Sequence, residues 1–428
     1  MFVLTVIALV MQQVAPYLFF FRRWNIPAHM GLGFCVTAFI VPGLFTDVWS
    51  VVSDKTNLYF FYINFFGALC LISGMAIGYF SPCYRWIHQK IGYLSSADLN
   101  IDKIEKRVII FALIGVVGIS LAYMIMGFVP MFAADPLSAK QFKGEYYEAY
   151  HRAASLFRFS FSVIVATLPI VLTFWWVKKK RSLLFLALLM IFLLLISLAR
   201  GSSLIGLITF AGFVAARRRS TALFYIFCLG IIFPIGSAGY YILGVLTGIE
   251  KFSSVYALDS VASVIASGSP DIADQLIFLE GFLRSTPFTY GRTFFGGLIP
   301  SNYMWNPSVW TLTYDNVGAD ITNVVSGGLR MTVAEWGFAS FGWIGVVMVP
   351  LISGFFSGTF LRVLSRFNFK GPLIPSALIL MLYITLGGQI VSFYTLSIHG
   401  VPTIMCTLFI CFGFKGVIAM FTSRRLLN

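Results

Sequence analysis

A series of long apolar stretches, separated by short connections, limits what this chain can fold into. Eleven such stretches can be drawn, at roughly 2–20, 28–45, 58–80, 108–132, 159–177, 182–199, 202–216, 221–248, 342–361, 372–396 and 401–421. A helix of about 20 apolar residues crosses the ~30 Å hydrocarbon core of a bilayer. Only 11% of the 428 residues are charged, against about a quarter in a soluble domain. The sequence therefore predicts an all-α polytopic membrane protein with about 11 transmembrane helices.

The connections between these stretches alternate in charge. One set carries 19 Lys and Arg against three acidic residues, and the other carries ten basic and thirteen acidic residues. The positive-inside rule assigns the basic set to the cytoplasm, which predicts an amino terminus outside and a carboxyl terminus inside. The net charge of +14 then reflects membrane orientation rather than nucleic-acid binding. Because arginines follow the first stretch rather than precede it, we expect a retained helix and not a cleaved signal.

One long segment, residues 249–341, interrupts the series on the predicted outer side. It separates a predicted bundle of eight spans, 1–248, from the last three spans, 342–428. Within it, the stretch 269–285 begins with Ser-Pro-Asp, a favourable helix start. Its apolar residues share one face, which predicts an amphipathic helix lying in the membrane–water interface. Glycines and prolines after Pro287 predict irregular backbone. Near a membrane such backbone is tolerated only where protein buries it or where it lines a cavity.

Arginines recur on the predicted outer side, and we expect some of them to hold an anionic substrate, because the guanidinium fork suits phosphate and pyrophosphate oxygens. Arg200 lies at the tip of a 35-residue hairpin, 182–216. As helix this hairpin rises about 52 Å, less than the roughly 60 Å needed to cross the core twice. An arginine at membrane depth usually faces a polar cavity and is functional, although Arg200 could instead extend outward from a locally thinned bilayer. The residues predicted to bind the substrate are Arg158, Arg200, Arg292 and Arg330.

The chain lacks the motifs of the common soluble enzymes. It has no Walker loop, no HExxH, no G-x-S-x-G and no Cys-x-x-Cys pair. The six cysteines lie in or beside apolar stretches, so we expect no disulfide framework and no zinc site. The predicted catalytic residues are Glu335 and His399, as candidate general bases, and Arg200. Glu335 could instead pair with Arg330 or cap the helix that follows.

Three stretches resemble those of the O-antigen polymerase family, the Wzy-type bacterial polymerases of oligosaccharide repeat units. They are LISLARGSSLIGLITF (195–210), GGLIPSNYMWNPSVW (296–310) and GGLRMTVAEWGFASFGWIGVVMV (327–349). Their order, the many spans and the single large outer loop late in the chain also resemble the family. The chain departs from the family pattern at Ser301, where many members have Arg, and at Asn306, where many have Lys or Arg. A basic role near Pro300 is therefore not carried over.

The resemblance implies a GT-C-like fold and a metal-independent, inverting glycosyltransferase of the bacterial inner membrane. Such an enzyme joins a growing glycan on undecaprenyl pyrophosphate to a new lipid-linked repeat unit at the periplasmic face, as in O-antigen and lipopolysaccharide biosynthesis. The implied partners are lipid-linked oligosaccharides, the membrane and a chain-length-regulating co-polymerase, with no nucleic acid. Two alternatives stay open: a ligase of the same fold, and a flippase or transporter of lipid-linked oligosaccharides. Transporters often contain internal repeats, and this sequence shows none.

Overall fold

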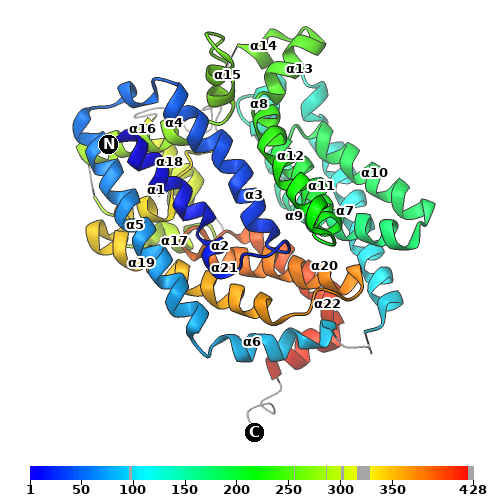
Figure 1. Cartoon of the computed structure of the whole chain (residues 1–428). Helices are drawn as coiled ribbons and strands as arrows, with labels where there is room; N and C mark the ends of the chain where they lie inside the picture. Colours follow the sequence, from blue (N-terminus) through cyan, green and yellow to red (C-terminus); the bar gives the residue numbers. More distant parts are fainter. Residues whose placement is uncertain (96–98, 255, 286, 300–302, 316–327, 423–428) are drawn as a thin grey trace.

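The structure is a helical bundle (Figure 1). It is a computed structural model, and it describes residues 1–95, 99–254, 256–285, 287–299, 303–315 and 328–422. Within these ranges all regular structure is helical, apart from one isolated bridge between Gly297 and Ser397. The all-α class predicted from the sequence is confirmed for this part of the chain.

Among the residues that the structure describes, eight helical segments are long and apolar enough to cross a membrane, judged by length and composition. They are Ile26–Phe45 (α3, Ile26–Cys35, and α4, Val41–Phe45, joined by a π-helical turn), Asp54–Phe80 (α5), Ile101–Phe132 (with α7, Ile101–Met126), Pro136–Lys178 (α8, Pro136–Gln141, and α9, Tyr146–Lys178), Arg219–Ser237 (α12), Val333–Arg366 (α19), Leu373–Val391 (α20, Leu373–Leu382, and α21, Gly388–Val391) and Val401–Ile418 (in α22, Val401–Thr422). Three shorter apolar helices lie where the sequence predicts further spans: Phe2–Val14 (α1), Arg181–Ile196 (α10) and Leu204–Ala215 (in α11, Arg200–Ala215). The multi-pass membrane character is confirmed, while the count of eleven spans and the GT-C-like fold stay predictions.

Two of the predicted spans are interrupted near a proline. The stretch 2–20 breaks before Pro16, which starts the short helix α2 (Pro16–Phe19); proline has no backbone N–H to continue the preceding helix. The stretch 221–248 breaks at Ala238, just after Pro234, into α12 and α13 (Gly239–Thr247). The predicted outer connection before residue 159 is also largely helical, because α9 already begins at Tyr146.

The described residues of the segment predicted as the large loop, 249–341, fold largely into short helices. These are α14 (Glu250–Ser253), α15 (Val261–Gly268), α16 (Asp271–Ser285), α17 (Arg292–Gly296) and α18 (Pro307–Asp315). One further short helix, α6 (Tyr84–Ile91), lies outside this segment, between α5 and α7. Helix α19 then begins inside the predicted loop and bends at Phe341 and Gly342, where Gly342 has φ +60°. The bend lies at the predicted boundary between the loop and the next span. Residues 333–340 of the predicted loop are therefore the first turns of α19.

Helix α16 confirms the helix predicted for 269–285 but is buried on a wider face than the predicted stripe. The sequence predicts one apolar face formed by Ile272, Leu276, Leu279 and Leu283, of which the first three are fully buried and Leu283 is partly buried. Phe278 and Phe282 are buried too, and they pack against Trp310 and Tyr314 of α18. The aromatic face therefore holds α16 and α18 together as part of the packed interior.

Helices α5 and α19 pack with their backbones in close contact. A Cβ atom added at Gly74 or Gly78 of α5 would overlap backbone carbonyl oxygens of α19, and one added at Gly354 or Gly358 of α19 would overlap those of α5. Both helices thus carry a small-xxx-small pair, the pattern that lets membrane helices approach closely. We call this contact the closed seam.

Candidate functional site

A cavity of about 280 Å³ lies between α3, α11 and α12, near the connection from α15 to α16. Its walls are mainly apolar, with Phe34 from α3, Ile205 from α11 and Phe233 from α12 among them. Its polar lining includes Ser269 and Arg330, which belong to the predicted outer segment. We call it the outer cavity. Its lining combines mainly apolar side chains with the guanidinium of Arg330.

Arg330 reaches this cavity as half of an ion pair. Its Nη1 lies 2.7 Å from Oδ2 of Asp271, whose side chain is almost fully buried at the first turn of α16. The same carboxylate oxygen accepts a hydrogen bond from the hydroxyl of Ser269. About half of the Arg330 side chain stays exposed, so its remaining N–H groups are accessible to an anion while Asp271 fixes the position of the guanidinium.

The start of α11 lies at the same cavity. Gly201 lines it, and Arg200 is the first residue of the helix; the side chain of Arg200 lies outside the described part of the structure. The first backbone N–H groups of a helix have no partner within the helix and attract anions. Of the predicted substrate-binding arginines, the structure thus brings Arg330 and the backbone at Arg200 to one place.

The predicted shortness of the hairpin that carries Arg200 is confirmed by its helix lengths. Helices α10 and α11 contain 16 residues each, which corresponds to about 24 Å, less than the ~30 Å hydrocarbon core. Leu198, in the turn, adopts a left-handed conformation with φ +57°, which allows the chain to reverse sharply. The tip and Arg200 are therefore held by short helices.

Thr37 gives the outer cavity a further polar group that sequence analysis did not identify. This residue of the π-helical turn Val36–Ile40, which follows α3, lines the cavity and is 3% exposed, and its hydroxyl has no hydrogen-bond partner among the described residues. A buried polar group without a partner is unfavourable, so the hydroxyl is a point where a ligand would be stabilised. A threonine inside an apolar stretch is too common for its sequence position to indicate this.

Arg292 and His399 belong to a different part of the molecule. Arg292 begins α17, and its guanidinium lies 5.0 Å from the ring centre of Trp305. The backbone N–H of Ile398 donates to the carbonyl of Gly297 at 2.8 Å, so α17 packs against the segment that leads to His399. The side chain of His399 lies outside the described part. The segments that carry Arg292 and His399 are thus in contact at Gly297 and Ile398, and Arg292 does not line the outer cavity.

Arg158 contacts the aromatic side chain of Tyr150. It lies on α9, where its Nε donates to the hydroxyl of Tyr150 and its guanidinium sits 5.4 Å from the centre of that ring. Tyr150 in turn stacks on Phe142 with ring centres 3.7 Å apart. The contacts of Arg158 stabilise the amino-terminal part of α9, and the residue does not line the outer cavity.

Glu335 caps α19. Its carboxylate accepts a hydrogen bond from the backbone N–H of Thr332 at 2.7 Å, and its own N–H donates to the Thr332 hydroxyl, which forms a capping box. The Thr332 hydroxyl also contacts Asn64 of α5, and Asn64 accepts from Gln12 of α1. Glu335 is 1% exposed and does not line the outer cavity. The capping alternative is confirmed, and Arg330 pairs with Asp271 rather than with Glu335.

Within the described residues, no group of three or more His, Cys, Asp or Glu side chains is arranged to hold a metal ion. Comparison with models of protein families, with curated proteins and with solved structures finds no match to this chain. The functional conclusion therefore depends on the chemistry of the cavity and on the sequence pattern.

Proposed function

We propose that the chain polymerises lipid-linked oligosaccharide repeat units on undecaprenyl pyrophosphate, as a metal-independent, inverting glycosyltransferase. The observation that supports this most directly is the outer cavity, where apolar walls meet Arg330 and the start of α11. An isoprenoid chain suits such walls. A pyrophosphate suits a guanidinium fork beside the N–H groups of a helix amino terminus.

In the proposed reaction the bond between the anomeric carbon and the pyrophosphate oxygen breaks, and the acceptor hydroxyl oxygen bonds to that carbon from the opposite face. Negative charge develops on the departing pyrophosphate, which Arg200 and Arg330 would stabilise. The acceptor proton passes to a base, for which His399 and Glu335 stay the predicted candidates. Because two lipid pyrophosphates take part, Arg292 and Arg158, which do not line the outer cavity, stay the predicted residues for the second substrate.

This proposal places the protein in the bacterial inner membrane with its amino terminus and the segment 249–341 in the periplasm and its carboxyl terminus in the cytoplasm. The basic connections assigned to the cytoplasm by charge support this orientation. A chain-length-regulating co-polymerase would act together with the enzyme. The GT-C-like class belongs to the same proposal.

Glycan profiles of cells that lack the protein test the reaction. Under the proposal, such cells accumulate a single lipid-linked repeat unit and make no polymer. A ligase defect would leave full-length polymer on the lipid carrier, and a flippase defect would trap the repeat unit on the cytoplasmic side. Either of those two patterns would replace the proposal by the corresponding alternative.

Arg330 needs a variant that separates substrate binding from its ion pair. Arg330→Ala alone would leave Asp271 buried and uncompensated, which is strongly destabilising. In Asp271→Asn/Arg330→Gln both charges are removed together, so the protein should accumulate while polymer is lost. Arg284→Ala is the matched control, because Arg284 is exposed and pairs with Glu280 at 2.5 Å, outside the outer cavity. Normal polymer in the double variant would show that Arg330 serves only Asp271.

A further inference from the structure

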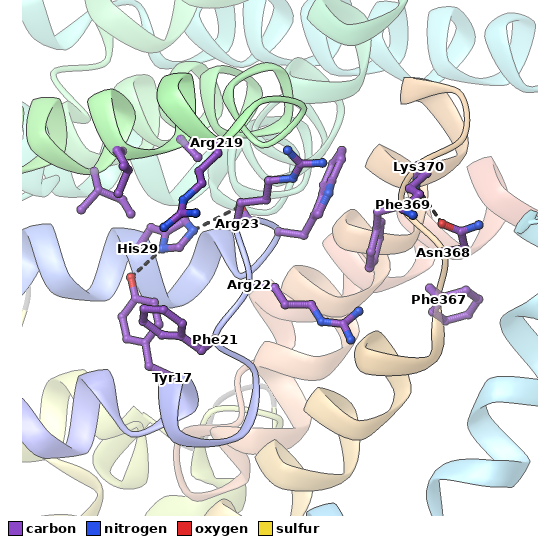
Figure 2. Close-up of a pocket in the computed structure, with 14 residues that line it drawn as sticks. Tyr17, Phe21, Arg22, Arg23, His29, Arg219, Phe367, Asn368, Phe369 and Lys370 are labelled. Carbon is purple, nitrogen blue, oxygen red and sulfur yellow. Dashed lines mark hydrogen bonds between the residues drawn. The ribbon is translucent and has the colours of Figure 1, made fainter.

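A second, larger cavity lies at the other end of the α3–α12 pair. Its volume is about 590 Å³, and it is bounded by the turn before α3, the first turns of α12 and the connection between α19 and α20 (Figure 2). Gly33 of α3 packs against Leu229 and Phe233 of α12 between this cavity and the outer cavity. We call it the inner cavity, because every connection that forms it belongs to the set assigned to the cytoplasm by charge.

Four cationic side chains from three separate connections line the inner cavity: Arg22, Arg23, Arg219 and Lys370. Figure 2 shows Arg219 and His29 on one side of the space and Asn368 and Lys370 on the other. No carboxylate is among the lining residues, and within the described part of the chain none of the four forms an ion pair. Like charges gathered without a counter-charge repel, so an anion bound among them would relieve that repulsion.

The turn that carries two of these arginines is held rigidly. Tyr17 and Nδ1 of His29 are hydrogen-bonded at 2.5 Å, and Nε2 of the same ring lies 3.2 Å from the carbonyl of Arg23. The Asn25 side chain donates to the carbonyl of Phe20 at 2.9 Å. The backbone of the turn is therefore positioned before any ligand binds, which lowers the entropic cost of binding.

Aromatic side chains connect the turn to the opposite wall. Trp24 stacks on Phe369, with ring centres 5.0 Å apart and an interplanar angle of 19°. Both rings and Phe367 are buried, so the α19–α20 connection that carries Lys370 is fixed to the turn that carries Arg22 and Arg23. The exposed ring of Phe21 adds apolar surface at the opening. The cavity thus joins a cationic rim to an apolar surface.

We propose that the inner cavity binds a phosphate group, carried by an anionic lipid headgroup or free in solution. Arginine forks contact phosphate oxygens bidentately and lysine acts as a point charge, and three connections together supply both kinds of side chain. The site is distinct from the glycosyl-transfer site and does not depend on the function proposed for it. Its role is to bind an anion at the end of the bundle opposite to the outer cavity.

The test uses the purified full-length protein in mixed micelles. One preparation contains phosphatidylglycerol, one contains phosphatidylcholine, and one contains phosphatidylcholine with inorganic phosphate. The midpoint of thermal unfolding is measured at low and high salt for the wild type and two double variants. Arg22→Gln/Arg219→Gln removes two cavity cations. Arg217→Gln/Arg218→Gln removes two exposed cations next to Arg219 that do not line the cavity.

The expected result is a rise in the midpoint of about 2–5 °C with phosphatidylglycerol relative to phosphatidylcholine. The rise should persist in Arg217→Gln/Arg218→Gln, shrink by more than half in Arg22→Gln/Arg219→Gln and weaken at high salt. An equal rise with inorganic phosphate, lost in the same variant, supports the site and assigns it to a free phosphate. No rise with either probe, or an equal rise in both double variants, would overturn the proposal.

A second variant keeps the test decisive if Arg22→Gln/Arg219→Gln does not fold. Lys370→Gln removes one exposed cavity cation from a different connection, and Lys103→Gln, exposed on α7 and outside the cavity, is its control. The phosphatidylglycerol-dependent rise should fall in Lys370→Gln and stay unchanged in Lys103→Gln. Equal responses in these two variants would also overturn the proposal.

Discussion

Two helix pairs in this bundle differ in how closely they pack, and the difference decides where the molecule holds space. In the closed seam, glycines on both α5 and α19 face the partner backbone. In the α3–α12 pair, which we call the open seam, a Cβ atom added at Gly33 of α3 would meet the side chains of Leu229 and Phe233 first, and the nearest backbone atom of α12 is further away, at 3.2 Å. Cavities lie on either side of that contact, whereas no described cavity is lined by the glycines of the closed seam.

The comparison indicates that the two helix pairs have different roles, one in stabilising the fold and the other in forming cavities. The closed seam anchors the fold, because its backbones contact along several turns and the capping box of Glu335 connects its end to α5 through Thr332 and Asn64. The open seam, visible in Figure 1 as α3 beside α12, supplies the binding volume. Substitutions should therefore affect folding in the first pair and ligand binding in the second.

The largest effect is expected from a side chain inserted into the closed seam. Gly78→Ala places a methyl group onto the Phe355 carbonyl, and a backbone atom cannot move aside as a side chain can. We expect overpacking of at least about 1–3 kcal/mol and a clear loss of protein from the membrane. Gly230→Ala on α12 is the control, because open space surrounds that position. Membrane protein level and the thermal midpoint measure both; equal accumulation would contradict the distinction between the seams.

A large loss of activity with normal protein level is expected in the open seam. Arg200→Lys keeps the charge but removes the planar fork, so under the proposed function polymer formation should fall by about 10²–10³-fold, as for the loss of an oxyanion donor. Glycan ladders on gels beside the membrane protein level measure this. Full-length ladders in the lysine variant would show that Arg200 contributes only a charge.

A smaller effect is expected from Glu335, in the closed seam. Gln at this position preserves a capping box, so Glu335→Gln should retain the thermal midpoint, and Glu335→Ala should lose about 0.5–2 kcal/mol. If the residue only caps α19, both variants that reach the membrane make polymer. Normal accumulation of Glu335→Gln together with a complete loss of polymer would instead assign the general base to this carboxylate.

Hydropathy and charge were sufficient to predict the helical class, the approximate positions of the apolar helices and the amphipathic helix at 269–285. They could not predict which residues meet across the bundle. The pairing of Arg330 with Asp271 joins residues 59 positions apart, and the sequence interpretation of Asp271 stopped at its place in a helix start. The inner cavity was missed for a similar reason, since positive-inside arginines are expected in any membrane protein and only the fold shows which of them share a cavity.

The sequence does not predict the extended helical part of the loop, because glycines and prolines favour irregular backbone. Proline at the start of α18, Pro307, is in fact a helix-starting residue. Glycines such as Gly296, where a Cβ would overlap the Trp305 carbonyl, mark close packing rather than disorder. Local sequence preferences place glycine and proline both in irregular backbone and at helix starts or close contacts. Tertiary packing decides which of these a given residue adopts.

The smallest effect concerns the outer end of the closed seam, where α16 is tied to the start of α5. The Glu280 carboxylate accepts hydrogen bonds from Ser53 and Thr56 and pairs with Arg284. The hydrogen bond from Thr56, followed by the one from Arg284, lowers the pKa of Glu280 to about 2 from an ordinary value of 4.5. A carboxyl with a lowered pKa stabilises the fold above its unfolded-state pKa, and the contribution is lost as the pH falls from about 4.5 towards 2.

Glu280→Gln should therefore lower the thermal midpoint by at most a few degrees at pH 7, and the gap to the wild type should close as the pH falls below about 4.5. Glu148→Gln is the control, because Glu148 is an exposed carboxylate on α9; its midpoint should follow the wild type at every pH. Thermal unfolding between pH 7 and pH 3 measures the three proteins. A gap between Glu280→Gln and the wild type that stays constant with pH would mean that the shape of the side chain, and not its charge, ties α16 to α5.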